Sequence, residues 1–484
     1  MVTTRVEDIS MITVGEWTPR GGELVEFVPV TQSREAARRA PVSPAPVSLL
    51  QQSHIRNKLA AERAGGAPAS SLGGVCTMTG RLDRAAAQQA VTAFVLRHET
   101  LRCWFAVEEA DGGFALTRHL VPSADVAFTT VSTGMFAASA DIRVAAGRRF
   151  RTDTNPVRWP AFVFGAIDHG DEFTLFFSMD HSSTDGYSIL LAFTELHALY
   201  RAYSTGTAAD LPETGSHLDF CRAESRVLEQ LDLEAPAIEE VLALLRDSAD
   251  EFRQLPLDYG LAPGQTAART DTRLAILDAD EADAFAAVCR ANDASFGVGL
   301  LAALAITDLE FAGRTSHHSF HVVSARTDPA YHAAQGWFVN YLPIGLTVGR
   351  DALFTHAAKE AAGAFNRLKP LIGVPILGLL GASGAPLASF ASPPMVSYLD
   401  YRRFSIASMP DVHSIHSLTT DSVLGPVAQV WFSREAHHTV ILVKHPDTAV
   451  ARESAGGYVR QLRRVVHDVA HTGDFHAVAP ARKP

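Results

Sequence analysis

A polar, turn-rich segment, STGTAADLPETG at residues 204–215, divides the chain into two halves that carry similar patterns. Helix-like periodicity and strand-like apolar runs alternate in both halves, which predicts the mixed α/β class rather than an all-helical or all-β fold. The 484 residues are enough for two or three domains. We therefore expect two lobes, at residues 1–205 and 216–484.

Charge and hydropathy exclude several classes of protein. The formal charge of -11 argues against a chain that mainly binds nucleic acid or anionic lipid. Glu7 and Asp8 occupy the place where a secretory signal has its apolar core, so we expect a cytoplasmic protein, with peripheral membrane contact left open. Residues 371–392 form a long uncharged run, but four glycines and two prolines favour a buried loop and short helix over a membrane span.

The four cysteines lie far apart, at positions 76, 103, 221 and 289, without a C-x-x-C pair. This spacing predicts neither a zinc site nor a disulfide framework, and we expect reduced, mostly buried thiols. Three histidines at 317, 318 and 321 alternate along a predicted strand, so they divide between its two faces. No metal site is predicted.

The segment MDHSSTDGYS, at residues 179–188, places His181, Asp185 and Gly186 on a short loop between a buried strand and a helix. Such a loop can present an imidazole to a cleft while its rigid flanks fix the position. By spacing alone, two interpretations are equally supported. His181 is either a catalytic base or a satisfied core histidine, with Asp185 capping the next helix.

The same loop resembles the His-His-x-x-x-Asp-Gly signature of the condensation-domain superfamily, which includes chloramphenicol acetyltransferase and the condensation domains of nonribosomal peptide synthetases. Further blocks of that superfamily follow in the same order. They are RHETLRCWF at 97–105, HLDFCR at 217–222, LPLD at 255–258 and GWFVNYLPI at 336–344. Five ordered matches between residues 97 and 344 are a strong signal.

The opening of the chain is similar to one branch, the polyketide-associated (Pap) acyltransferases that esterify trehalose-type glycolipids. The residues concerned are EWTP at 16–19, the segment 38–41 and the pair Gln51 and Gln52. The wider resemblance implies two chloramphenicol-acetyltransferase-like lobes arranged in a V, with an active-site tunnel between them. It also implies a monomer without a bound cofactor, in which acyl-CoA or an acyl carrier phosphopantetheine is the donor substrate.

The resemblance assigns roles to the loop residues. His181 is expected to act as the general base that takes a proton from the attacking acceptor. Asp185 is expected to hold the loop by pairing with an arginine, and Arg326 is the candidate partner, with a solvated surface residue as the alternative. Gly186 is expected to permit the turn into the helix, where a side chain would clash if its φ were positive.

One position departs from the signature, because Asp180 stands where the superfamily usually has its first histidine. Neighbouring residues at a strand end point to opposite faces, so Asp180 is expected to be structural or capping. Contact with the tunnel or substrate stays open for Asp180, Asn340 and Asp400. An edge-of-strand amide and a turn aspartate are the alternatives for the last two.

The sequence therefore predicts a stand-alone acyltransferase that moves an acyl group from a thioester to a hydroxyl of a sugar, glycolipid or other alcohol. An acyl or peptidyl carrier protein remains a candidate partner. An amide-forming condensation enzyme of the nonribosomal peptide type is the first alternative, and a non-catalytic docking module is the second. The apolar run at 371–390 could line an acyl channel, although packing explains it equally well.

Overall fold

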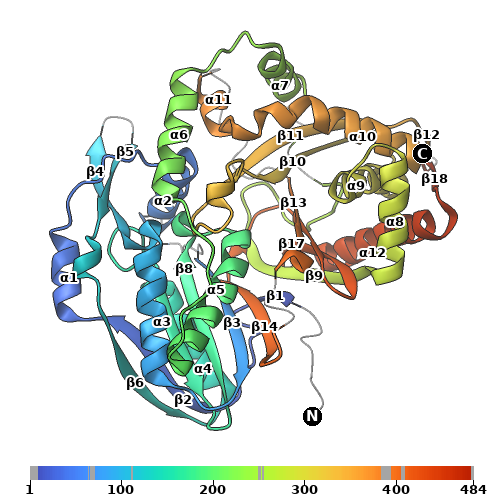
Figure 1. The fold of residues 1–484 in the computed structure, drawn as a ribbon. Helices are drawn as coiled ribbons and strands as arrows, with labels where there is room; N and C mark the ends of the chain where they lie inside the picture. Colours follow the sequence, from blue (N-terminus) through green and yellow to red (C-terminus); the bar gives the residue numbers. More distant parts are fainter. Residues whose placement is uncertain are drawn as a thin grey trace. The chain divides into compact units, whose positions relative to one another are not determined.

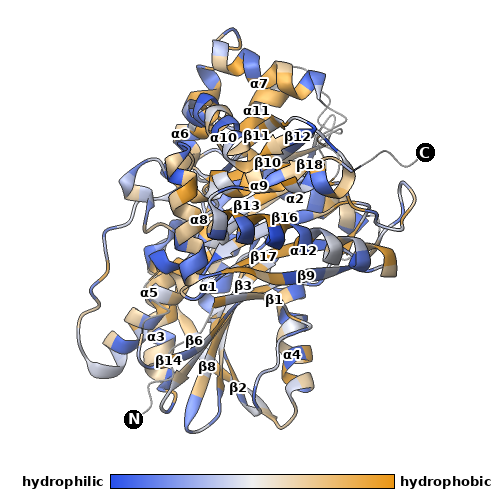
Figure 2. Cartoon of the chain, turned by 90° about the vertical axis from the view of Figure 1, so that its right-hand side faces the viewer, coloured by the Kyte–Doolittle hydropathy of each residue, from blue (hydrophilic) through white to orange (hydrophobic). Residues whose placement is uncertain are grey.

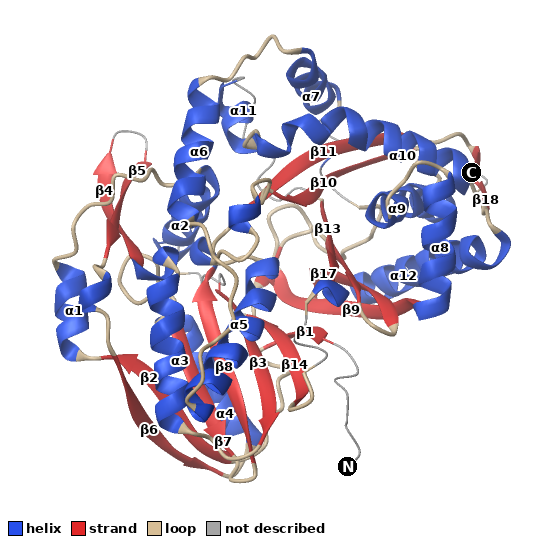
Figure 3. Cartoon of the chain, viewed as in Figure 1, coloured by secondary structure: helices blue, strands red, loops and turns tan. Residues whose placement is uncertain are grey.

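The computed structural model describes residues 9–63, 65, 71–110, 113–248, 252, 255–382, 394–404 and 409–480. The chain forms two compact units (Figure 1). The first comprises Met1–Arg226, Arg326–Phe338 and Arg403–Ser422, and the second comprises Val227–Ala325, Val339–Arg402 and Val423–Pro484. Each unit pairs a seven-stranded sheet with helices (Figure 3), which confirms the mixed α/β class.

The sheet of the first unit is antiparallel apart from one edge pair. Only the pair β1 and β14 runs parallel. The strands lie in the order β1 (Ile9–Thr13), β14 (Val412–Thr419), β3 (Ser71–Thr79), β8 (Glu172–Asp180), β7 (Phe162–Asp168), β2 (Gly22–Pro29) and β6 (Phe128–Phe136). A separate hairpin joins β4 (Cys103–Ala110) to β5 (Gly113–Leu120).

Aromatic side chains attach helices to both faces of this sheet. Phe164 and Phe177 meet α3 (Arg84–Arg97) and α5 (Gly186–Thr205) through Phe94 and Phe193. Phe176, adjacent to Phe177 along β8, points to the other face, where α4 (Ser139–Thr152) packs. The period of two along β8 therefore determines which helix covers which face.

Further helices belong wholly or mostly to the first unit. They are α1 (Thr31–Arg38), α2 (Leu49–Arg63) and α6 (His217–Glu229), most of which belongs to this unit. Helix α2 contacts the short 3-10 turn His181–Ser183 that follows β8. Helix α5 begins at an aspartate cap on Asp185 and ends at Gly206, whose φ of 69° is the left-handed conformation that glycine adopts without strain.

The second unit has its own sheet and a larger apolar core. Strands β10, β13 and β16 run parallel to one another, and the other pairings are antiparallel. The order is β11 (Val339–Thr347), β10 (Ser316–Ser324), β13 (Met395–Asp400), β16 (Gln429–Arg434), β17 (His438–Pro446), β9 (Ala267–Asp278) and β15 (Val423–Leu424). A small pair joins β12 (Asp351–Leu353) to β18 (His476–Val478).

Helix α9 (Phe296–Ala312) is the central helix of the second unit and is buried from Gly297 to Leu309. Around it pack α8 (Ala279–Ala291), α10 (Phe354–Leu368) and α12 (Ala449–Thr472). In Figure 2, α12 turns mainly polar residues to the viewer, as expected for a helix with one apolar face. Two shorter helices, α7 (Pro236–Asp247) and α11 (Ile376–Ala382), complete the unit.

The unit boundaries differ from the two contiguous lobes expected at residues 1–205 and 216–484. Residues 206–226, 326–338 and 403–422 cluster with the first unit, because β14 pairs with β3 and the start of α6 packs beside the separate hairpin of β4 and β5. The turn-rich segment 204–215 is therefore a connection inside the first unit and not its border.

Only part of the apolar run at 371–392 lies among the described residues. Residues 383–392 lie outside the described residues, while Leu371, Ile376, Leu379 and Leu380 are buried in the core of the second unit. Packing explains this described part. Among the described residues no single helix is long and apolar enough to cross a membrane, and one pair, α8 with α9, passes such a test only across a 90° bend.

Candidate active site

His181 lies at the turn where the central strand β8 ends and the path to α5 begins. The loop between them is short, and Ser182, Ser183, Thr184 and Asp185 are all buried. The imidazole itself is only partly buried. A rigid strand and a capped helix therefore hold a side chain that still reaches the surface of its unit.

A backbone carbonyl sets the tautomer of His181. Its Nδ1 lies 2.9 Å from the carbonyl oxygen of Thr184, and a carbonyl can only accept, so Nδ1 carries the hydrogen in the neutral ring. Nε2 then holds a lone pair, and no described residue bonds to it. Burial and, to a smaller extent, the positive charge of His54 together lower the pKa of His181 to about 4, against the opposing effects of a backbone hydrogen bond, Asp180 and Asp185. The ring is neutral at pH 7.

Trp337 packs directly on the His181 ring, with centroids 4.1 Å apart and planes 33° from parallel. The carbonyl of Trp337 lies 3.2 Å from Nε2 of His217, at the start of α6. Gly336 permits this approach, since a Cβ there would collide with the His217 ring. Two of the motif blocks, HLDFCR and GWFVNYLPI, thus meet behind the imidazole.

A third block, RHETLRCWF, meets the same segment. The amide of Gln335 donates to Nδ1 of His98 at 3.4 Å, and Nε2 of His98 lies 2.9 Å from Glu195 on α5. Gln335 also donates from its side chain to the carbonyl of Ser188 at 2.7 Å. Residues far apart in the sequence therefore brace the stretch that carries Trp337.

Asp185 is the hub of the loop and is 2% exposed. Its carboxylate accepts from the amide of Ser188 at 2.6 Å and from the amide of Phe338 at 2.8 Å. Nη2 of Arg326 lies 3.4 Å from both carboxylate oxygens, so the structure brings the expected pair together. The contact is looser than a two-pronged fork, because a single nitrogen spans both oxygens.

The shortest hydrogen bonds of Arg326 are to groups other than Asp185. Nη1 donates to the carbonyls of Tyr331 and Ala334 at 2.6 and 2.7 Å, and Nη2 donates to Oγ of Ser188 at 2.7 Å. The guanidinium also stacks 4.1 Å from the Phe338 ring. Arg326 is 6% exposed, so the alternative of a solvated surface residue is wrong. It ties the backbone of residues 331–334 to Asp185 and to Ser188 at the start of α5.

Gly186 is the first residue of α5 and is exposed. Its backbone is not in the left-handed region, so the condition under which a side chain would clash through φ does not arise.

Asp180 is completely buried and caps the 3-10 turn by accepting from the amide of Ser182 at 2.9 Å. It also accepts from two side chains of α2, Nε2 of His54 at 3.0 and 3.2 Å and Nζ of Lys58 at 3.0 Å. Burial opposes ionisation, but His54, Lys58 and the Ser182 amide outweigh it and hold the pKa of Asp180 below its usual range. The capping role is the one expected from the sequence, whereas the contacts with His54 and Lys58 of α2 were not predicted.

Asn340 and Asp400 belong to the second unit and serve local structure there. The Asn340 amide donates to the carbonyls of Leu371, Ile372 and Val374, and its oxygen accepts from the amide of Ile376 at 3.1 Å. Asp400 accepts from the side chain and amide of Arg402, two residues on. Asn340 thus binds the backbone of residues 371–376, and Asp400 binds the amide and guanidinium of Arg402. These are local structural contacts of the kind that the alternatives describe.

The four cysteines are buried and unpaired, as the sequence predicts. Burial raises the pKa of every one of these thiols, for example that of Cys221 to about 11. They are therefore un-ionised at neutral pH and poor nucleophiles.

Comparisons with known proteins identify the family of this chain. The model of the family described as "Condensation domain" matches residues 64–387. The chain belongs to the condensation-domain family. Among curated relatives, it is 28% identical to "Acyltransferase PapA3" of Mycobacterium tuberculosis, over 98% of this chain and 100% of the relative. It is 26% identical to "2'-acyl-2-O-sulfo-trehalose (hydroxy)phthioceranyltransferase PapA1" of Mycobacterium bovis, over 99% and 93%.

Solved structures share the fold of this condensation-domain protein. "PapA2 acyl transferase" superposes with a TM-score of 0.84 at 24% identity, covering 96% of this chain and 100% of that one. A starter condensation domain of rhizomide synthetase, a mutant in complex with C8-CoA, gives 0.63 at 18% identity, covering 92% and 97%. The relatives are named as acyltransferases of the Pap type, and this condensation-domain protein is an acyltransferase.

Two functional candidates, His54 and Lys58, did not emerge from the sequence. Their spacing of four residues on a predicted helix places both on one face, which was the only available signal. Trp337 lay inside a recognised block but was not distinguished from its neighbours.

Proposed function

We propose that this acyltransferase moves an acyl group from a thioester, either acyl-CoA or a carrier-bound acyl group, to a hydroxyl of a sugar or glycolipid, with His181 as the general base. The observation that carries the proposal is the His181 ring itself. Its Nδ1–H is bonded to the Thr184 carbonyl, so the neutral ring offers Nε2 as a proton acceptor.

The proposed reaction needs no covalent enzyme intermediate. As the acceptor oxygen attacks the thioester carbonyl, its proton passes to Nε2 of His181, the C–O bond forms and the C–S bond breaks. The leaving thiolate then takes that proton, which restores the neutral ring. Because a thioester is already activated, alignment and one proton relay are sufficient. The un-ionised thiols of the chain play no part.

The nature of the acceptor rests on the relatives. One is named a trehalose-2-sulfate acyltransferase, and another a transferase acting on an acylated sulfo-trehalose. The chain aligns with both over at least 94% of its length. A disaccharide hydroxyl is therefore the acceptor to test first, and a long-chain acyl thioester is the donor.

The test is direct. The purified full chain is incubated with acyl-CoAs of 8 to about 18 carbons together with trehalose, sulfated trehalose, a long-chain alcohol and an amino acid thioester, and products are resolved by mass spectrometry. We expect acylated sugar and free CoA in equal amounts. Acylation of the amine alone would overturn the ester-forming proposal, and absence of any acyl transfer would leave the docking-module alternative.

A further inference from the structure

We propose that His54, anchored by Asp180, is a positioning residue for His181 and supplies from α2 the second imidazole that this loop lacks in its sequence. The inference rests on the proposed function. It starts from one geometric fact: the residue at the position of the missing first histidine, Asp180, binds a histidine from another element, with its two oxygens 3.0 and 3.2 Å from Nε2 of His54.

Three rings form a cluster at this point. The His54 ring lies edge-on to Trp337, with centroids 5.6 Å apart and planes at 89°, and 6.0 Å from the His181 ring. Trp337 packs on His181 at 4.1 Å. His54 thus supports the indole that supports the base, and its own orientation is set by the Asp180 carboxylate. Edge-to-face ring contacts of this kind are directional as well as apolar.

Charge explains why an aspartate, and not a histidine, stands at position 180. Lys58 is 7% exposed, and its ammonium group donates to Asp180 at 3.0 Å and to the Thr154 carbonyl at 2.9 Å. A buried ammonium is costly without a counter-charge. An imidazole at 180 would remove that counter-charge and add a donor. Asp180, His54 and Lys58 therefore depend on one another.

The same cluster affects the protonation of the base. The titratable groups that act on His181 are His54 from α2, Asp180 from β8 and Asp185 at the start of α5. A positive His54 disfavours a second positive charge on His181, so it helps to keep the base neutral. A residue that served only packing would not have this effect.

The first experiment compares His54→Gln with His54→Ala. Glutamine retains an N–H where Nε2 was, so it can still donate to Asp180, but it lacks the ring and the charge. We expect His54→Ala to lower kcat by up to about 10-fold through misplacement of the base, and glutamine to recover part of this loss. In both variants the acid limb of kcat/KM should move to higher pH. A wild-type acid limb and kcat in both would overturn the proposal, as would a fall in melting temperature alone.

His181→Ala is measured in parallel, so that the base role of His181 and the positioning role of His54 are tested separately. If His181→Ala retains wild-type turnover, the proposed base mechanism fails regardless of His54. If His181→Ala is inactive while both His54 variants behave as wild type, only the positioning role fails.

The second experiment tests the dependence on Lys58. Asp180→His introduces the histidine of the family signature, and we expect it to lower both the melting temperature and kcat. In Asp180→His/Lys58→Met the buried ammonium is gone, so part of both losses should be recovered. An Asp180→His variant that equals wild type, or a double variant that shows only the sum of the single losses, would overturn the proposed dependence.

A different observation, on the second unit, supports an independent proposal: we infer that Glu281, His467 and His471 form a binding site for a divalent transition metal of the zinc class. His467 and His471 are one helical turn apart on α12, and Nε2 of each approaches the same oxygen, Oε1 of Glu281, at 3.3 and 3.0 Å. The three ligand atoms all lie within 4.8 Å of one another. Ligands about 2.0–2.1 Å from a tetrahedral zinc ion are themselves about 3.3 Å apart, a spacing that the two His–Glu distances already approach.

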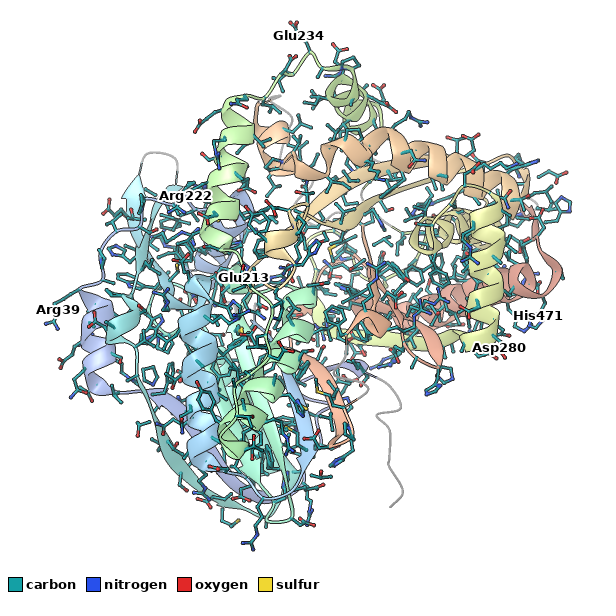
Figure 4. The ribbon with its side chains drawn as sticks, in the orientation of Figure 1. Arg39, Glu213, Arg222, Glu234, Asp280 and His471 are labelled. Atoms are coloured by element: carbon teal, nitrogen blue, oxygen red, sulfur yellow. The ribbon has the colours of Figure 1, made fainter. Side chains whose placement is uncertain are left out.

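Neighbouring groups orient these ligands. The other oxygen of Glu281 accepts from the amide of Asp278 in a capping box at the start of α8, which directs Oε1 toward α12. Nδ1 of His467 faces Asp468 at 3.5 Å, the carboxylate–histidine arrangement that typically supports a metal ligand. His471 lies at the edge of this unit, near Asp280 on α8, where an ion has access from solvent (Figure 4).

Zinc chloride titration of the untagged full chain tests this site by calorimetry and thermal unfolding. We expect one equivalent to bind with micromolar affinity and to raise the melting temperature, because the ion would join α8 to α12. His471→Ala should weaken binding by at least about 10-fold, whereas the surface control His437→Ala should not. Binding that His471→Ala and His467→Ala both leave unchanged would identify an adventitious ion only and overturn the proposal.

Discussion

Two histidines, one in each unit, differ in how many of their ring nitrogens are hydrogen-bonded. His181 of the first unit has its Nδ1 hydrogen bonded to a carbonyl and its Nε2 unbonded among the described residues. His317 on β10 of the second unit has Nδ1 2.7 Å from Asp308 and Nε2 3.1 Å from Oγ of Ser319. In connectivity the latter set is a serine–histidine–aspartate triad.

The triad-like set is nevertheless structural. Ser319 is 0% exposed, His317 2% and Asp308 3%, and Tyr458 donates a further bond to Asp308 at 2.7 Å. Every polar atom of the His317 ring is used inside the core, so no substrate atom can replace a partner. His181 keeps one nitrogen open at a partly exposed position. An available lone pair at Nε2 is therefore what distinguishes His181, the proposed base, from His317.

The largest effect should come from His181→Ala. Removal of a general base lowers kcat by about 10²- to 10⁴-fold while the KM for the acyl donor changes little. His197→Ala is the matched control, because His197 also lies on the first unit, is 11% exposed and is bonded to a carboxylate, that of Asp411. Steady-state kinetics on both variants test this prediction. Equal losses of kcat in the two variants would contradict a special role for His181.

Asp185→Ala should damage stability and activity together. It deletes the cap of α5, the acceptor of the Phe338 amide and a carboxylate that lies 3.4 Å from Nη2 of Arg326. Leaving a buried guanidinium without its partner typically costs about 3–5 kcal/mol. Urea unfolding gives the loss of free energy, and Asp185→Asn, which keeps one acceptor oxygen, should retain part of it. A stable Asp185→Ala protein would mean that the Arg326 bonds to backbone carbonyls suffice.

His317→Ala, in the second unit, should lower stability while leaving kcat nearly unchanged. The substitution leaves Asp308 and Ser319 buried without their partner, which costs about 1–3 kcal/mol. The kcat of the folded fraction should remain within about twofold of wild type. Denaturant titration and turnover on the same sample test this. A loss of kcat as large as that of His181→Ala would assign chemistry to the second unit.

The smallest expected change is that of Trp337→Leu. Loss of the ring that packs on His181 removes a stacking contact worth about 0.5–1.5 kcal/mol, which corresponds to at most about a tenfold fall in kcat. Trp431→Leu, in the second unit, is the control for removal of a tryptophan. Unchanged kcat in Trp337→Leu would show that the carbonyl of Thr184 alone is enough to orient the base.

The sequence predicted the loop well because its determinants are local. A strand, a histidine, an aspartate cap and a helix follow one another within about 30 residues, and each has a recognisable pattern. Asp185 and Arg326 could be paired only through the family resemblance, since 141 residues separate them. The competing bonds of Arg326 to the Tyr331 and Ala334 carbonyls and to the Ser188 hydroxyl depend on backbone paths that a single sequence does not reveal.

Long-range contacts explain what was not predicted. Strand β14 joins the first sheet by pairing with β3, more than 300 residues earlier, so the border of the first unit could not be placed from turn signals. His54 and Lys58 reach Asp180 across more than 120 residues, and their helix carries no distinctive pattern. The sequence shows Asp180 as a departure from the motif, but it does not show that His54 and Lys58 of α2 bind this carboxylate.

The protonation state of His181 is the central claim, and its direct measurement is a pH titration of the imidazole by nitrogen-detected NMR on protein with labelled histidine, assigned with His181→Ala. We expect the neutral Nδ1–H form at pH 7 and protonation only near the pKa of about 4. Because an unfolded histidine titrates near 6.5, the unfolded chain binds the proton first, and stability should fall as pH drops from about 6.5 to 4. An ordinary pKa near 6.5, or a hydrogen on Nε2 at pH 7, would contradict the account.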